Sequence, residues 1–106
     1  MTPVFFKNEA TKDLKDAISW YENKRKGLGK GFRESFEEVL ERIAQNPYRY
    51  AAIHEDVRCG RLKRFPYGLF YYVVRDQAVI VIAISHHARD SGHWKSRVKS
   101  HKPQES

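Results

Sequence analysis

Two groups of basic and aromatic side chains have the clearest potential for chemistry. The first group occupies one short stretch and consists of Arg58, Arg61, Lys63, Arg64, Phe65 and Tyr67. The second group follows an apolar run and consists of His86, His87, Arg89, Trp94 and Arg97. Cationic side chains bind phosphates and carboxylates, and aromatic rings add apolar contact area beside them. We therefore expect a surface that binds a polyanion or an acidic protein; the plainer alternative is an edge strand that its charges protect from aggregation.

Catalytic patterns other than these basic groups are not found. The sequence has no nucleophile elbow, no Ser-His-Asp pattern in a supporting context, and no pair of carboxylates that suggests an acid/base couple. Any reaction at the basic groups would be of the ribonuclease kind. Basic side chains would orient a phosphate and stabilise its developing charge, and a His or Tyr would transfer a proton.

A metal site and a phosphate loop are both disfavoured by spacing. His86 and His87 are adjacent, so on a strand they point to opposite faces, and His93 alone does not complete a zinc site. The glycines at positions 27, 29 and 31 follow a helical pattern rather than a strand, which predicts a turn between helices. We expect no metal and no cofactor, and we interpret Cys59 as an ordinary small strand residue.

Two amphipathic helices are expected to support these groups. The first covers residues 9–26, with Asn8 as its N-cap and with Asp13 largely off its apolar stripe. The second ends at Asn46-Pro47, because the residue before a proline is pushed out of helical geometry. The two apolar stripes consist of Ala10, Leu14, Ala17, Ile18 and Tyr21 in the first helix, and of Phe32, Phe36, Val39, Leu40 and Ile43 in the second.

The remaining segments read as strands. Residues 4–6 form a short β-prone run, residues 57–65 are basic, and residues 69–75 and 79–84 are almost continuously apolar. Asp76-Gln77 predicts a tight hairpin between the last two. The order is β-α-α-β-β-β, which indicates an α+β fold with a helical hairpin packed on a mainly antiparallel sheet. Residues 1–97 are expected to form one domain, and residues 98–106 a polar tail.

Composition favours a small, basic, cytoplasmic protein. The chain has 106 residues and a net charge of +7, from 20 basic and 13 acidic side chains. Most of the excess lies in the second half, where residues 51–106 carry ten basic and five acidic side chains. One cysteine suits a reducing compartment, and neither a signal peptide nor an apolar run of roughly 20 residues is present.

The order of these features resembles the RelE/ParE toxin superfamily, closer to its ParE branch, from about residue 8 to residue 97. The matching residues are Asp13-Leu14, Trp20-Tyr21, Gly29, Phe32, Phe36, Ile43, Asn46-Pro47, Val57-Arg58, Phe65-Pro66-Tyr67, Phe70-Tyr71, His86, Arg89-Asp90, Trp94 and Arg97. The resemblance implies a type II toxin that a cognate antitoxin neutralises, with antitoxin contacts near Trp20. ParE-like members are associated with DNA gyrase, and RelE-like members cleave mRNA on the ribosome.

Two positions separate the branches. RelE-like nucleases have a catalytic Arg directly after the Tyr that enters the central strand, and this chain has Gly68 there. They also have a Tyr near the C-terminus, where this chain has Trp94, which offers no acidic hydroxyl. The resemblance therefore favours a toxin that binds gyrase. The alternatives are a ribosome-dependent endoribonuclease that uses Arg64, His86 or Arg89, and an inactive member that only binds its antitoxin.

The expected target-contacting residues are Arg58, Arg61, Lys63, Arg64, Arg89, Trp94 and Arg97. Among them, we expect Arg58, Arg64, Arg89 and Trp94 to matter more for toxicity than for folding, with their polar ends in solvent. The alternative for Arg89 is a structural pair with Asp90 or with a carboxylate of the second helix.

Overall fold

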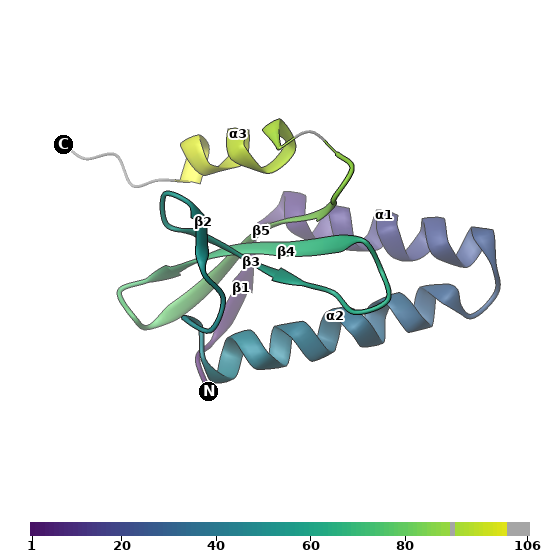
Figure 1. Cartoon of the computed structure of the whole chain (residues 1–106), viewed down its shortest axis with the longest axis horizontal. Helices are drawn as coiled ribbons and strands as arrows, with labels where there is room; N and C mark the ends of the chain where they lie inside the picture. Colours follow the sequence, from purple (N-terminus) through teal and green to yellow (C-terminus); the bar gives the residue numbers. More distant parts are fainter. Residues whose placement is uncertain (90, 102–106) are drawn as a thin grey trace.

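The chain folds into one five-stranded sheet with helices on both faces (Figure 1). The computed structural model describes residues 1–89 and 91–101. Its elements are β1 (Val4–Phe6), α1 (Asn8–Lys24), α2 (Leu28–Gln45), β2 (Ala52–His54), β3 (Val57–Arg61), β4 (Tyr67–Val74), β5 (Ala78–His86) and α3 (Gly92–His101). The strand order is β1-β5-β4-β3-β2, and only β1 and β5 run parallel. The predicted α+β class and the mainly antiparallel sheet are confirmed.

The helical hairpin turns at Gly27, whose φ of 93° is favourable for a residue without a side chain. The Glu22 carboxylate accepts hydrogen bonds from the backbone N–H groups of Gly27 and Gly29 at 3.1 and 3.0 Å. This places a negative charge at the N-terminus of α2, where the helix dipole favours it. At Gly29 the helices are so close that an added Cβ would lie 2.9 Å from the Ile18 carbonyl oxygen. The predicted N-cap is wrong, since Lys7 holds that position and Asn8 is the first helical residue.

The main core lies between this hairpin and the sheet. Phe32 and Ile43 of α2 are fully buried, and Leu14, Ile18 and Tyr21 of α1 are partly buried around them. On this face the sheet and the loop after β3 contribute Leu62, Leu69, Tyr71, Val79, Val81 and Ile84. The predicted apolar stripes are therefore confirmed as the faces that cover the sheet.

A β-bulge in β5 changes which face of the sheet the side chains of this strand occupy. Phe70 pairs with Ala83, whereas the next residue, Tyr71, pairs with Val81, so Ile82 is the extra residue. Because of this bulge, Ile82 and Ala83 both pack on the face opposite the hairpin, and Ile84 turns back to the hairpin. Phe70 and Ala83 therefore pack with Trp94 under α3 and not under the helical hairpin.

A second, smaller core lies under α3. Trp94 and Val98, four residues apart in α3, are 7% and 5% exposed, and Trp94 stacks on Phe70 with ring centroids 4.7 Å apart. The predicted tail is wrong for residues 98–101, which continue α3. The spacing of apolar residues did not predict this helix, because only two apolar residues mark its buried face. Residues 102–106 of that tail lie outside the described residues.

The basic strand is shorter than predicted. β3 ends at Arg61, and residues 62–66 form a loop that the Ser35 hydroxyl holds by donating to the Lys63 carbonyl at 2.6 Å. Arg64 has a left-handed φ of 70°, so Lys63 and Arg64 do not alternate as strand residues. The sequence also gave no indication of β2, a three-residue edge strand. The β4–β5 hairpin is confirmed as a tight turn, with positive φ at Arg75 and Asp76.

Within residues 1–89 and 91–101, no helix combines the length and apolar character needed to cross a membrane.

The packing of α2 generates a stability prediction. Phe36 is 4% exposed and its ring lies 5.9 Å from that of Phe6. Replacing Phe36 by Ala should lower the free energy of unfolding by about 3–5 kcal/mol, because it removes apolar contacts and leaves a cavity. Chemical denaturation measures this, with Glu37→Ala on the exposed face as the control. An equally small effect of both substitutions would contradict the packing.

Candidate functional site

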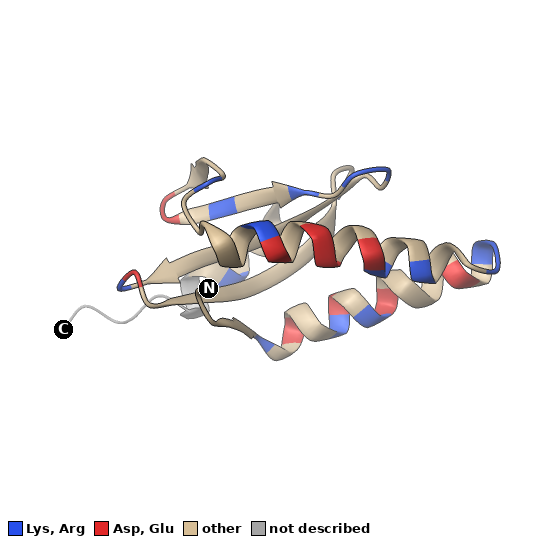
Figure 2. Cartoon of the chain, turned by 90° about the horizontal axis from the view of Figure 1, so that it is seen from below, with Lys and Arg blue, Asp and Glu red and all other residues tan. Residues whose placement is uncertain are grey.

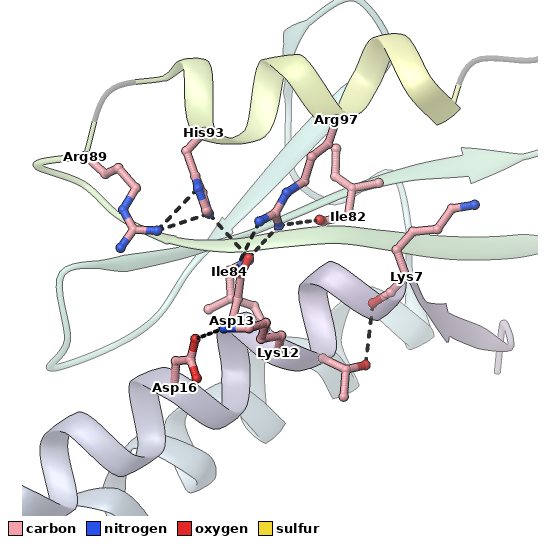
Figure 3. A network of polar contacts seen from close by, with 10 residues as sticks. Lys7, Lys12, Asp13, Asp16, Ile82, Ile84, Arg89, His93 and Arg97 are labelled. Atoms are coloured by element: carbon pink, nitrogen blue, oxygen red, sulfur yellow. Dashed lines mark hydrogen bonds and ion pairs between the residues drawn. The ribbon is translucent and has the colours of Figure 1, made fainter.

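A polar network joins α1, β5 and α3 around Asp13 (Figure 3). Arg97 of α3 donates to both Asp13 oxygens, at 2.6 and 3.2 Å, and to the Ile82 carbonyl at 2.9 Å. The Ile84 backbone N–H donates to Asp13 at 3.0 Å. The Asp13 and Arg97 side chains are 11% and 16% exposed. Such a shielded, bidentate pair fixes α3 over the sheet far more firmly than a surface ion pair would.

His93 and Arg89 extend this network toward solvent. His93 Nε2 lies 3.4 Å from Asp13 Oδ2, and Arg89 Nη1 lies 3.3 Å from both ring nitrogens of His93. Arg89 is exposed, in the loop between β5 and α3. The predicted pairing of Arg89 with a carboxylate of α2 is not found among the described residues; the alternative partner, Asp90, lies outside them.

Titration of the site is biased toward neutral imidazoles. Burial lowers the pKa of His93, nearby Arg97 and Arg89 lower it further, and Asp13 opposes them. Burial also lowers the pKa of His87, with help from Arg61. Neutral imidazole suits a ring that accepts a hydrogen bond from a guanidinium.

A cleft of about 500 Å³ opens beside this network, between α1 and the loop after β5. It is lined by Asp13, Asp16, Ala17, Trp20, Tyr67, Ile84, His86, Ala88 and Arg89. Trp20 is 49% exposed, which is unusual for so large an apolar side chain. Burial raises the pKa of Tyr67, with Arg89 opposing, so its hydroxyl stays protonated at neutral pH.

A second hollow, of about 260 Å³, lies on the α3 side of the sheet and brings both predicted basic groups together. Arg61 from the first group and His86, His87 and Arg89 from the second line it. Lys63 and Arg64 are exposed in the neighbouring loop, outside its lining. Arg58 is half-buried; it donates to the Tyr50 carbonyl at 2.6 Å and lies over the Tyr48 ring.

Trp94 and Arg97 have packing roles that the sequence did not reveal. Trp94 is buried on Phe70, so the expectation that it reaches solvent is wrong. Arg97 is engaged by Asp13, an acid that sequence reasoning placed off the apolar stripe. The spacing of Asp13 from Ala10 and Ala17, three and four residues, would have placed it on that stripe, since both alanines are buried.

Two further features that the sequence analysis considered are the Cys59 thiol and a metal site. Burial raises the pKa of the Cys59 thiol to about 11, so it is protonated and a poor nucleophile at neutral pH. Among the residues that the structure describes, no group of three His, Cys, Asp or Glu side chains is arranged to hold a metal ion.

The fold is that of known bacterial toxins. The chain of a chromosomal ParDE system from P. aeruginosa superposes with a TM-score of 0.70 at 17% identity, covering 81% of this chain and 96% of that one. The isolated E. coli RelE toxin gives 0.63 at 20% identity, covering 94% and 98%. A chain of the intact E. coli RelBE toxin–antitoxin complex also gives 0.63, at 22% identity, covering 84% of this chain and 100% of that one. No curated protein shows significant similarity to the sequence.

A helical hairpin on a small, mainly antiparallel sheet is therefore the fold that this chain shares with these toxins. Residues 4–91 match the model of the ParE toxin of the parDE type II toxin–antitoxin system. The chain belongs to this ParE toxin family, which confirms the resemblance seen in the sequence.

The Asp13 network generates a first prediction for the site. Asp13→Asn should lower the free energy of unfolding by about 2–3 kcal/mol, because the shielded Arg97 guanidinium loses its counter-charge. Asp16→Asn, which affects only the exposed Lys12–Asp16 pair, should cost less than about 0.5 kcal/mol. Urea denaturation of both variants tests this, and equal losses would contradict a special role for Asp13.

The second prediction concerns pH. Because folding lowers the pKa of His93, the unfolded chain binds more protons near the ordinary value of about 6.5. Stability should be fully present above that pH and should fall as the pH drops through it. His93→Gln should flatten this decline, measured as the urea midpoint between about pH 7.5 and 5. An unchanged slope would show that other groups, such as His87, are responsible.

Proposed function

We propose that this toxin acts in the cytoplasm by binding DNA gyrase and that a cognate antitoxin neutralises it. The observation that carries the gyrase assignment is Gly68. A Cβ placed on Gly68 would lie 2.5 Å from the Cys59 sulfur and 3.3 Å from the Phe70 ring. The strand position at which RelE-like nucleases use an arginine is thus closed to any side chain unless its neighbours move.

The burial and chemistry of Trp94 also argue against a RelE-like nuclease. Its indole is buried against Phe70 and offers no hydroxyl for proton transfer, whereas RelE-like nucleases place a Tyr in this part of the chain. Neither of the two positions that distinguish the nucleases therefore carries the group that their reaction uses.

The proposed target surface lies at the end of β3 and in the loops after β3 and β5, and we call it the basic edge. Arg61 ends β3, Lys63 and Arg64 follow in the loop, and Arg89 lies across the hollow. Exposed guanidinium groups on rigid elements are suited to bind an acidic protein face or a nucleic acid held by it. Arg58, Trp94 and Arg97 are proposed to support this surface from behind, through the contacts described above.

The antitoxin is proposed to cover Trp20 and the neighbouring part of α1. An indole that is half exposed on a small domain is a typical anchor for a partner chain. Burial of this side chain would stabilise the toxin by mass action, as any partner that binds only the folded state does.

Purified toxin added to gyrase and plasmid DNA tests the proposal. We expect loss of supercoiling and accumulation of cleaved DNA, with no cutting of mRNA on translating ribosomes. Cut mRNA would instead identify an endoribonuclease in which Arg64, His86 or Arg89 substitutes for the missing arginine. Inactivity in both assays, with retained antitoxin binding, would identify a member that only pairs with its antitoxin.

Variants of the basic edge separate toxicity from folding. Arg61→Ala and Arg89→Ala should abolish growth inhibition while changing the free energy of unfolding by less than about 0.5 kcal/mol, because both side chains are exposed. Arg33→Ala, an exposed arginine on α2, is the matched control and should remain toxic. Full toxicity of both edge variants would contradict the proposed surface.

A further inference from the structure

The 500 Å³ cleft beside α1 has an apolar floor and one aromatic wall. Ala17 and Ile84, which are 5% and 2% exposed, form part of its lining, and Trp20 and Tyr67 contribute aromatic rings. The Trp20 indole packs by its edge against Tyr21, and Lys24 lies 4.6 Å from its ring centre. The indole is therefore held in place while half of its surface remains open to a bulky apolar group.

The charged side chains around the cleft differ in whether a side chain of opposite charge pairs with them. Asp13 is satisfied by Arg97, by His93 and by a backbone N–H group, and Asp16 has Lys12 at 3.0 Å. Arg89 contacts only the His93 ring by its side chain, and no carboxylate pairs with it among the described residues. Arg89 is thus the charged group of the cleft that a ligand has to match, and a carboxylate is its natural partner.

The same charges argue against nucleic acid in this cleft. Among the described residues that line the cleft, Arg89 is the only lysine or arginine, so a strand of phosphates would find a single such cation there, beside the carboxylates of Asp13 and Asp16. A peptide brings one carboxylate to Arg89 and needs no further anionic contact. Its apolar neighbour can bury the open face of Trp20, which contributes affinity through area removed from water.

We propose that the cleft binds a short segment of a partner protein in which a bulky apolar side chain packs on Trp20 and an adjacent acidic side chain pairs with Arg89. The inference deepens the proposed function, on which it rests, by assigning this segment to the antitoxin. Its occupant covers Arg89, a residue of the proposed target surface. The antitoxin would thus neutralise the toxin by masking Arg89 directly.

Two blocked dipeptides serve as probes of the cleft: acetyl-Leu-Glu-amide and acetyl-Leu-Lys-amide, each titrated into ¹⁵N-labelled toxin. The Glu peptide should shift the Trp20 indole N–H and the Ile84 amide resonances with a millimolar dissociation constant. The Lys peptide should bind about two- to fivefold more weakly, the range expected for one exposed ion pair. Arg89→Ala should remove this difference, and Trp20→Ala should abolish binding of both peptides. Arg33→Ala, on the exposed side of α2, should leave the dissociation constants of both peptides unchanged.

Equal binding of the two peptides to the native chain, or no shift at millimolar concentration, would overturn the proposal. A dinucleotide that shifts the same resonances more strongly than the Glu peptide would overturn it in favour of nucleic acid. The gyrase assay is independent of these titrations. A toxin that inhibits gyrase without binding the Glu peptide refutes the cleft assignment alone, and peptide binding without gyrase inhibition refutes only the proposed target.

Discussion

The bond between Asp13 and Arg97 links three elements that are remote in the sequence. It connects α1 to α3 directly, and through the Ile82 carbonyl and the Ile84 N–H group it connects both to the bulged part of β5. The bulge lies at Ile82, and Ile84 is paired with Leu69 of β4 just beyond it. A buried carboxylate alone would carry a large desolvation cost, so the guanidinium and the backbone donor make its position tolerable. The placement of His93 and Arg89, and hence the shape of the adjacent cleft, depends on this arrangement.

The sheet has two differently covered faces, and this difference separates stability from recognition. The helical hairpin covers one face almost completely with a large aromatic and aliphatic core. On the other face α3 covers the sheet through Trp94 and Val98, and the hollow that brings Arg61, His86 and Arg89 together lies beside it. Exposed loops at the ends of β3 and β5 supply most of the basic side chains there, as is common for binding surfaces carried on a rigid scaffold.

Charge is also unevenly distributed, although α1 and α2 each carry both signs (Figure 2). Acidic side chains follow the solvent face of α2, where Glu34, Glu37, Glu38 and Glu41 are all exposed. Basic side chains concentrate on the loop between β3 and β4 and at the turn of the hairpin. A net charge of +7 is therefore not spread evenly. This uneven distribution favours one orientation of an approaching charged partner over others.

Local patterns determined much of this protein before any tertiary information. The 3.6-residue spacing of Phe32, Phe36 and Ile43 and the apolar runs of β4 and β5 were enough to predict the hairpin and the sheet, because burial imposes a period on each element. The family was indicated separately, by the resemblance of the motifs along the chain. Only the folded chain decided the rest. The bulge at Ile82, the helix around Trp94 and the partner of Arg97 depend on contacts between residues as far apart as 13 and 97, which no local period records. Trp94 and Arg97 looked like recognition residues because aromatic and basic types serve both binding and packing, and burial alone distinguishes the two uses.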